Sequence, residues 1–404
     1  MKKRLAAIVL SAMMAASLLA CGSSDSSAPA STDSAAETTE AAAEDDGEAV
    51  GQADVYFAPA EVTKFNPDEL DHHKIAFSYY AFSDKLGSQF QKSIQYLADA
   101  YNCDVVFFES GSSTDDQVTN LESVLSAGDI EGVIYVGGSP ALVDVANKYG
   151  AAFVSACGFP STEEEIKGVA SYDNYLGGVI DDDVWAGEQV QQALYDAGCR
   201  NIAFSGLTQG LVKSHDDRAQ AMRDFVASHD DYNLLADNYS WGEAANDVAT
   251  FHASFPELDG IGFSAIGDEI YLALESEGLT DGSIKIAGVD ISSQTGIYFQ
   301  NGVQVWTCGG QYATAETAFA VLYNYLSDGT RIITDTSTPL IRKYIAITSY
   351  DDYKNYVQYV EGDVPTYTAD EIADMIHVFN PDITYADYET YADTYSLEDI
   401  ISRR

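Results

Sequence analysis

Residues 74–109 have the sequence KIAFSYYAFSDKLGSQFQKSIQYLADAYNCDVVFFE, and this stretch determines the expected fold. Its two ends, residues 74–80 and 104–109, are short apolar runs typical of strands, and the second is continuous, as in a parallel strand buried on both faces. The residues between them that recur at helical spacing are Phe90, Ile94, Leu97, Ala98 and Tyr101. The stretch therefore predicts a strand–helix–strand unit with a right-handed crossover.

The same alternation continues along the chain and then restarts. Strand-like runs follow at residues 132–136 and 151–157. A second set has such runs at residues 201–205, 233–239, 260–265 and 284–289. Because alternating strands and helices form parallel sheets with helices on both faces, two sets predict an α/β protein with two doubly wound parallel-sheet lobes.

The N-terminus has the features of a secretory signal. A basic head, Lys2 to Arg4, precedes an apolar run over residues 5–20 that is too short for a spanning helix. The ending LLAC resembles a bacterial lipobox, in which the cysteine thiol is the point of lipid attachment. We expect a signal peptide over residues 1–20, lipidation of Cys21, and a disordered acidic linker over residues 21–54, which has no aromatic residue, Lys or Arg.

The net charge of −44 restricts the possible partners. Affinity for nucleic acid comes largely from Lys and Arg at phosphates, so a nucleic-acid-binding protein is not expected. An anionic lipid surface is equally unsuitable, and membrane contact is expected through Cys21 alone. The simplest reason for the acidity is solubility in an exposed compartment.

Neither the cysteines nor the other reactive side chains form a recognisable catalytic or metal motif. Apart from Cys21, the cysteines lie in or beside apolar runs, so free buried thiols are expected, although three disulfide pairings are possible on paper; they are Cys103, Cys157, Cys199 and Cys308. No HExxH, GxSxG or phosphate-binding glycine loop is present. We therefore expect no enzyme activity, no cofactor and no metal site.

Residues 351–404 form a separate, tyrosine-rich region. Ten of the 27 tyrosines lie at Tyr344 or later, and Tyr388, Tyr391 and Tyr395 recur at helical spacing. Thr368 and Glu371 have the spacing of a helix capping box. These patterns predict a helical C-terminal extension that packs on the body of the protein, with a partner-binding surface as the alternative.

Several segments, taken in order, resemble the type I periplasmic binding proteins, the sugar-binding lipoproteins of ABC transporters. They are the opening at residues 74–98, VASYDNYLGG at 169–178, the helix around Arg218, AIGDEIYL at 265–272, IAGVD at 286–290 and VQVWTCGGQY at 303–312. The resemblance covers roughly residues 74–345.

The resemblance implies two lobes joined by a three-segment hinge. The N-terminal lobe is expected to comprise residues 71–171 and 306–331, and the C-terminal lobe residues 172–305 and 332–350. The hinge residues it implies are Asp173, Asn174, Gly177, Gly178, Gly309 and Gly310.

A ligand in this fold lies between the lobes, at the carboxyl ends of the strands. The residues expected to contact it are Tyr79, Tyr80, Phe82, Asp216, Arg218, Trp241, Asp268, Asp290, Trp306 and Gln311. Each has a structural alternative: the aromatic residues as core, Asp290 as a helix cap, and Arg218 in an ion pair with Asp216. Asp216 and Cys157 stand where sugar-binding relatives carry other residues. These departures from the usual pentose and hexose pattern suit a nucleoside, a modified sugar, a cationic compound or a small signalling molecule.

The resemblance implies an extracytoplasmic, lipid-anchored solute-binding protein. It would capture a small polar ligand, in the first place a sugar, and deliver it to an ABC permease without catalysing a reaction. The alternative is a ligand-sensing co-receptor for a chemoreceptor or sensor kinase. A DNA-binding regulator would need a helix-turn-helix where this chain has its signal and linker.

Overall fold

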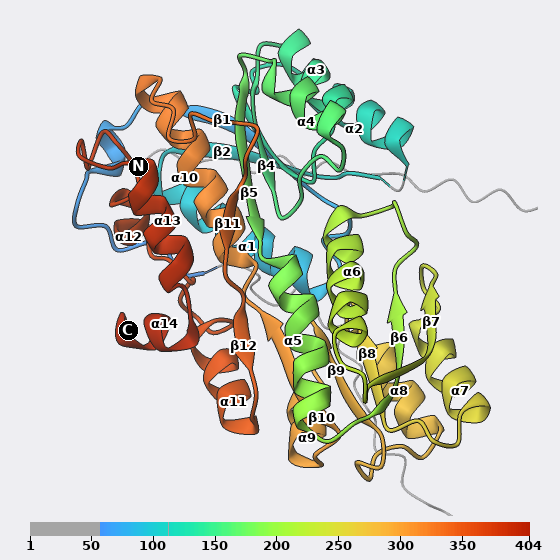
Figure 1. Ribbon diagram of the computed structural model, residues 1–404. Coiled ribbons are helices and arrows are strands. Elements are labelled where there is room, and N and C mark those ends of the chain that lie inside the picture. Colours follow the sequence, from blue (N-terminus) through green and yellow to red (C-terminus); the bar gives the residue numbers. More distant parts are fainter. Residues whose placement is uncertain (1–56, 112) are drawn as a thin grey trace, which may run out of the picture. The chain divides into compact units, whose positions relative to one another are not determined.

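The computed structural model describes residues 57–111 and 113–404, and a short 3₁₀ turn (Pro67–Glu69) precedes the first strand (Figure 1). The first sheet has the strand order β11-β5-β4-β3-β1-β2, with neighbouring strands parallel. Its strands are β1 (His73–Tyr79), β2 (Cys103–Glu109), β3 (Gly132–Val136), β4 (Ala152–Ala156), β5 (Tyr175–Asp181) and β11 (Leu340–Arg342). Its helices are α1 (Lys85–Ala100) and α10 (Tyr312–Asp328), whose residues share one core, and α2 (Thr114–Ser126), α3 (Pro140–Lys148) and α4 (Glu163–Ala170), whose residues share another.

The second sheet repeats this plan, with the order β12-β10-β9-β8-β6-β7 and only β12 antiparallel to its neighbour. Its strands are β6 (Asn201–Gly206), β7 (Asn233–Tyr239), β8 (Gly260–Phe263), β9 (Lys285–Val289), β10 (Gln304–Gly309) and β12 (Ile345–Ile347). One core holds α5 (Asp183–Asp196) and α6 (Lys213–Ala227), and the other holds α7 (Ala244–Ser254), α8 (Asp268–Ser276) and α9 (Thr295–Gln300). The predicted fold class, two doubly wound α/β lobes, is confirmed.

The chain passes between the sheets three times, and all three of the expected lobe boundaries were wrong. Strand β5 pairs with β4 in the first sheet, so the first crossing follows Asp181 and does not precede residue 172. Strand β10 pairs with β9 in the second sheet, so the second crossing lies between Gly309 and α10 and not before residue 306. Strand β11 pairs with β5 in the first sheet, so the third crossing lies between β11 and β12 and not after residue 331.

Four of the six residues expected in the hinge lie inside the first lobe. Asp173 and Asn174 precede β5, and the Asn174 side chain donates a hydrogen bond to the Ala151 carbonyl, 2.8 Å away. Gly177, at φ +103°, lies at an irregularity of the β4–β5 pairing, and side chains pack closely over it and Gly178. Gly177 and Gly178 allow the irregular backbone and the close packing of β5, whereas Gly309 and Gly310 lie at the second crossing.

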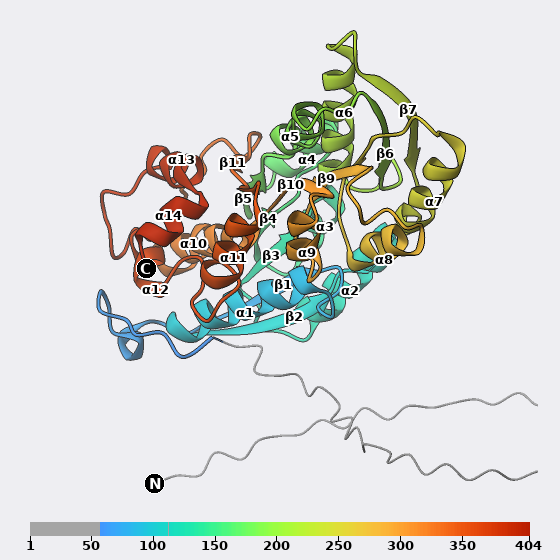
Figure 2. The same ribbon diagram turned by 90° about the horizontal axis from the view of Figure 1, so that it is seen from below.

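The C-terminal extension consists of α11 (Tyr350–Tyr359), α12 (Ala369–Ala373), α13 (Tyr385–Thr394) and α14 (Leu397–Ser402). Figures 1 and 2 show α12 and α13 beside α10 of the first lobe, and α11 beside α9 of the second, while α14 packs on α11. Tyr388 and Tyr395 are fully buried, and the Tyr395 hydroxyl donates to the Gly310 carbonyl at the second crossing, 2.8 Å away. The tyrosines therefore dock the extension on the body, as predicted.

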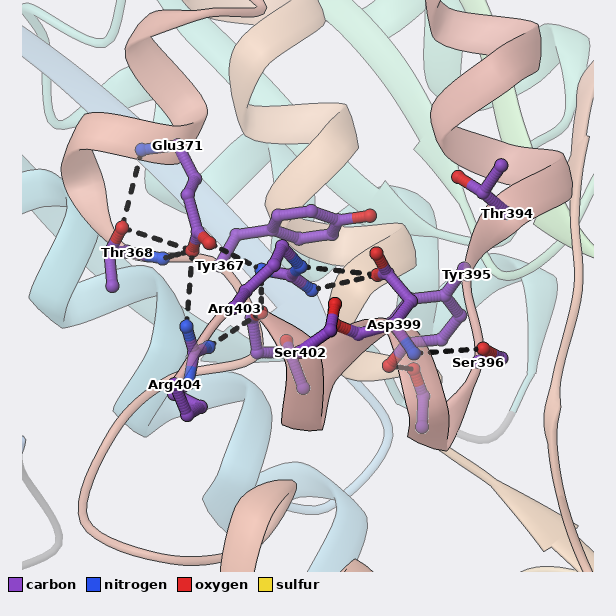
Figure 3. Close-up of polar contacts among 12 residues, drawn as sticks. Tyr367, Thr368, Glu371, Thr394, Tyr395, Ser396, Asp399, Ser402, Arg403 and Arg404 are labelled. Carbon is purple, nitrogen blue, oxygen red and sulfur yellow. Dashed lines mark hydrogen bonds and ion pairs between the residues drawn. The ribbon is translucent and has the colours of Figure 1, made fainter.

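Charged contacts within the extension fix its end. The predicted capping box is confirmed, because Thr368 and Glu371 each bond the other's backbone. Figure 3 shows Glu371 between Thr368, Arg403 and Arg404, with 2.7 Å between Arg403 Nη1 and Glu371 Oε1. Arg404 Nη2 also donates to the Thr366 carbonyl, 2.9 Å away, so the last residues close the loop that leads into α12.

A cluster of buried polar side chains lies where the extension covers the crossings. Arg342 of β11 is fully buried, and its guanidinium carbon lies 4.8 Å from the centre of the Tyr395 ring. Asp181 accepts a hydrogen bond from Thr314 (2.6 Å), and Glu316 accepts one from Thr366. Burial raises the pKa of Asp181 to about 7 and that of Glu316 to about 7.

The four cysteines that the structure describes are free thiols, as expected. No helix in the described part of the chain is long and apolar enough to cross a membrane. The expected signal peptide, lipidation site and linker together cover residues 1–54, which lie outside the described residues.

Substitution of Gly187 in α5 tests the packing of this helix on α6. A Cβ atom at this position would lie 2.8 Å from the Arg218 Cα atom and 2.9 Å from the Ala221 Cβ atom. We expect Gly187→Ala to lower the free energy of unfolding by about 1–3 kcal/mol, because overpacking forces the helices apart. Urea unfolding measures this, with Glu188→Ala on the exposed face of α5 as the neutral control. Equal stability of the two variants would contradict the close approach.

The two raised carboxyl pKa values predict how stability depends on pH. In the folded protein Asp181 and Glu316 keep their protons up to about pH 7, whereas unfolded carboxyls lose them near pH 4. The folded state thus binds more protons between these values, and their contribution to stability falls as pH rises from about 4 to about 7.

We expect the double variant Asp181→Asn and Glu316→Gln to flatten this slope in urea unfolding between pH 5 and pH 8. The exposed Asp230→Asn is the matched control and should keep the original slope. An unchanged slope in the double variant would show that these carboxyls are not protonated in the fold.

Candidate functional site: a cleft between the sheets

A cavity of about 1050 Å³ lies between the two sheets. Its walls come from the carboxyl ends of strands in both: Tyr79 ends β1 and Asp181 ends β5, while Ser240 follows β7 and Asp290 follows β9. Ligands in open α/β sheets bind at this edge, because the loops there are free to carry polar side chains. The cavity is the candidate ligand site.

Asp290 is held rigidly at the floor of the cleft. Its backbone has φ +82°, a left-handed conformation that is strained for a residue with a side chain. Its N–H donates to the Cys308 carbonyl (2.9 Å), and its own carbonyl accepts from the Thr307 hydroxyl (2.6 Å). Gln311 Nε2 donates to Oδ1 of the carboxylate, 2.6 Å away, so the two predicted residues act together.

Arg218 also lines the cleft, but its bonds are to the protein. Its Nε donates to Asp183 Oδ1 (2.7 Å), Nη1 to the Ser264 carbonyl (2.8 Å), and Nη2 to the Tyr344 hydroxyl (2.7 Å). Tyr344 in turn donates to the same Asp183 oxygen, 2.8 Å away. The alternative of an ion pair between Arg218 and Asp216 was wrong, because the carboxylate that pairs with Arg218 is that of Asp183.

Burial alters the charge of the groups around this pair. It raises the pKa of Asp290 and of Asp183, in both cases against the opposing effect of Arg218. Burial and Arg218 together hold the pKa of His215 well below its usual range, and the His215 ring bonds the Ser264 hydroxyl, 3.0 Å away. His215 is thus a neutral partner in the cleft wall near pH 7.

Two aromatic rings meet at the mouth of the cleft. Tyr80 comes from the first lobe and Trp241 from the second, and their ring centres lie 5.4 Å apart in an edge-to-face arrangement. Both are about half exposed, at 46% and 47%. Tyr79 lies further inside, and its hydroxyl donates to Asp84, 3.3 Å away.

Seven of the ten predicted contact residues line the cleft, and three do not. Phe82 packs on Phe77 and Phe107 in the core of the first lobe. Trp306 is buried against Trp185 of α5, because alternation along β10 turns its side chain toward the face of the sheet that α5 covers. Asp216 accepts hydrogen bonds from the Gly210 N–H, at 2.9 and 3.1 Å, and so closes the loop before α6.

Sequence reasoning missed the cleft residues Asp84, His215 and Tyr344, and it missed Asp183, the buried partner of Arg218. Asp84 carried a usable signal, because it caps α1 (2.6 Å from the Gly87 N–H) directly after the first strand's loop. Asp183 and Tyr344 lie 35 and 126 residues from Arg218, and their contact with it depends on tertiary structure. No group of three or more potential metal-ligating residues occurs in the described part of the chain.

Several solved structures with a similar fold are solute-binding proteins. One from Agrobacterium vitis, an ABC transporter solute-binding protein bound to α-D-tagatopyranose, has 17% identity and a TM-score of 0.58, over 72% of this chain and 97% of that one. One from Actinobacillus succinogenes with bound D-allose has 16% identity and a TM-score of 0.60, over 70% and 100%. One from Shewanella sp. ANA-3, of an arabinose ABC transporter, has 16% identity and a TM-score of 0.59, over 71% and 96%.

No curated protein matches the sequence. The sequence model of the periplasmic binding protein domain matches residues 75–330, most of the chain, and ends before the extension begins. The predicted resemblance is therefore confirmed, and the chain belongs to the periplasmic binding protein family.

Proposed function

We propose that this protein is an extracytoplasmic solute-binding protein that captures a sugar-sized polar ligand between its lobes and delivers it to an ABC permease. The observation that carries the proposal is the cavity at the strand ends of both sheets, with Asp290 fixed at its floor. A ligand held by both lobes stabilises the arrangement in which both contact it, and a permease can recognise that arrangement.

The contents of the cleft suit such a ligand. Asp290 and Gln311 supply acceptor and amide groups, and Tyr80 and Trp241 supply flat apolar faces. Polar groups that fix orientation and aromatic groups that cover the apolar face of a ring are the usual elements of a sugar site. The tagatose, allose and arabinose named for the solved relatives support a ligand of this class.

The protein itself performs no chemistry in this proposal. Membrane attachment would come from a lipid on Cys21, with residues 22–54 as the tether. The strongly acidic surface would keep the protein away from anionic lipid while leaving it free to meet the permease.

A thermal-unfolding screen of the full-length chain tests ligand capture. Monosaccharides, amino sugars, inositols and nucleosides are added singly, and a ligand that binds only the folded state must raise the melting temperature. At a concentration of 100 times Kd the expected stabilisation is about 2.7 kcal/mol. Asp290→Asn should weaken binding and so reduce the shift at the same ligand concentration, because Asn tolerates the left-handed backbone but removes the charge. Asp230→Asn is the control. An undiminished shift in Asp290→Asn would move the site elsewhere.

Tryptophan fluorescence tests where the ligand lies. Of the three tryptophans only Trp241 lines the cleft, while Trp185 and Trp306 pack on each other. We expect a bound ligand to change the emission, and Trp241→Phe to remove most of that change. Trp185→Phe should keep it. The reverse result would place the ligand-sensitive tryptophan in the core and not at the mouth.

A further inference from the structure

Acidic side chains line the cleft in excess. Asp84, Asp268 and Glu269 lie at exposed positions around it, and Asp290 lies deeper. Asp181 also lines the cavity, but it keeps its proton up to about pH 7 and adds little charge below that pH. A concave surface with one sign of charge raises the local concentration of ligands of the opposite sign.

The basic side chains of the cleft do not offset this excess, because each is already paired. Lys85 Nζ lies 2.9 Å from Glu361 Oε2 of the extension. Arg218 Nε lies 2.7 Å from Asp183 Oδ1, and the pair is buried. Among the described residues that line the cavity, these two are the only Lys or Arg, so an anionic ligand would find no unpaired cation.

Asp290 presents one carboxylate oxygen to the cavity. Gln311 donates to Oδ1, and Oδ2 accepts no hydrogen bond from the residues that the structure describes. The carboxylate cannot easily turn away, because the Asp290 backbone is held on both sides by β10. Its raised pKa, due to burial, agrees with a negative charge that the protein leaves only partly compensated.

The aromatic residues nearby also favour a positive group. Tyr80 and Trp241 are each about half exposed at the mouth, and an ammonium group is attracted to the face of an aromatic ring as well as to a carboxylate. A hydroxyl donates one hydrogen bond to Asp290 and brings no charge, whereas an ammonium donates up to three and neutralises the carboxylate.

We propose that the cleft selects a sugar-sized ligand that carries a protonated amine, with the ammonium at Asp290 and an apolar face of the ligand against Tyr80 and Trp241. This rests on the proposed function, since it names the class of ligand for the same site. It excludes phosphorylated and carboxylated ligands on grounds of charge.

Calorimetric titration of the full-length chain with matched probes tests this proposal. D-glucosamine, D-galactosamine and D-mannosamine are each compared with the parent hexose and with the N-acetylated sugar, at pH 6.5 and low salt. We expect at least one amine to bind at least tenfold more tightly than both of its neutral counterparts. Added salt should weaken the binding of the amine and leave that of the parent hexose unchanged.

Two variants separate a charge effect from a folding defect. Asp290→Asn should reduce the preference for the amine to less than threefold, with the circular dichroism spectrum unchanged. Glu269→Gln, at an exposed position, should slow association of the amine and not of the parent hexose; Asp230→Asn should change neither.

The outcomes distinguish the two proposals. A parent hexose that binds as tightly as its amine overturns the selection for charge and leaves the solute-binding function standing. If neither hexoses nor hexosamines bind, both the amine selection and the sugar-sized ligand are overturned. An amine preference that persists in Asp290→Asn places the ammonium elsewhere and overturns the assignment to Asp290.

Discussion

The buried guanidinium of Arg218 is the interaction on which the cleft depends. A charge removed from water costs several kcal/mol unless it is paired and hydrogen-bonded, so the residues around it must stay in place. Its partners come from three parts of the chain: Asp183 begins α5 after the first crossing, Tyr344 lies in the third crossing, and Ser264 follows β8. The floor of the cleft is therefore also the joint between the lobes.

The same pairing determines what the cleft can offer to a ligand. Because Asp183 and Tyr344 occupy Arg218, its charge serves the protein's own structure more than a ligand. His215 is neutral near pH 7, because its burial and the neighbouring positive charge of Arg218 both lower its pKa. Among the charged side chains that line the cavity the carboxylates outnumber the basic groups, and Asp290 is the most constrained of these carboxylates.

Sequence alone predicts the regular part of this structure because strands buried on both faces leave continuous apolar runs, as β3 and β9 do. The run of β2 was expected to be buried in the same way, but β2 is an edge strand and most of its residues are only partly buried. It fails for β5, where Gly177 and Gly178 interrupt the pattern, and for β11 and β12, which have three residues each. In the site, Asp290 and Asp268 were predictable from their place after a strand. Asp183 and Tyr344 were not predictable, because their roles come from burial and from contacts with residues far away in the sequence. Phe82 and Trp306 are aromatic residues of the kind that a sugar site uses, but their side chains pack in the core.

The extension adds a constraint that the family's shared domain does not contain. Tyr356 and Tyr395 pack on Gly309 and Gly310 at the second crossing, and Tyr395 also bonds the Gly310 carbonyl. Because α11 packs beside α9 of the second lobe and α13 beside β11 of the first, the extension contacts both lobes on the side of the crossings (Figure 2). A rotation of one sheet against the other must therefore change these aromatic contacts as well as the hinge dihedrals. The glycines at this crossing supply backbone freedom, and the tyrosines packed on them limit how much of it is used.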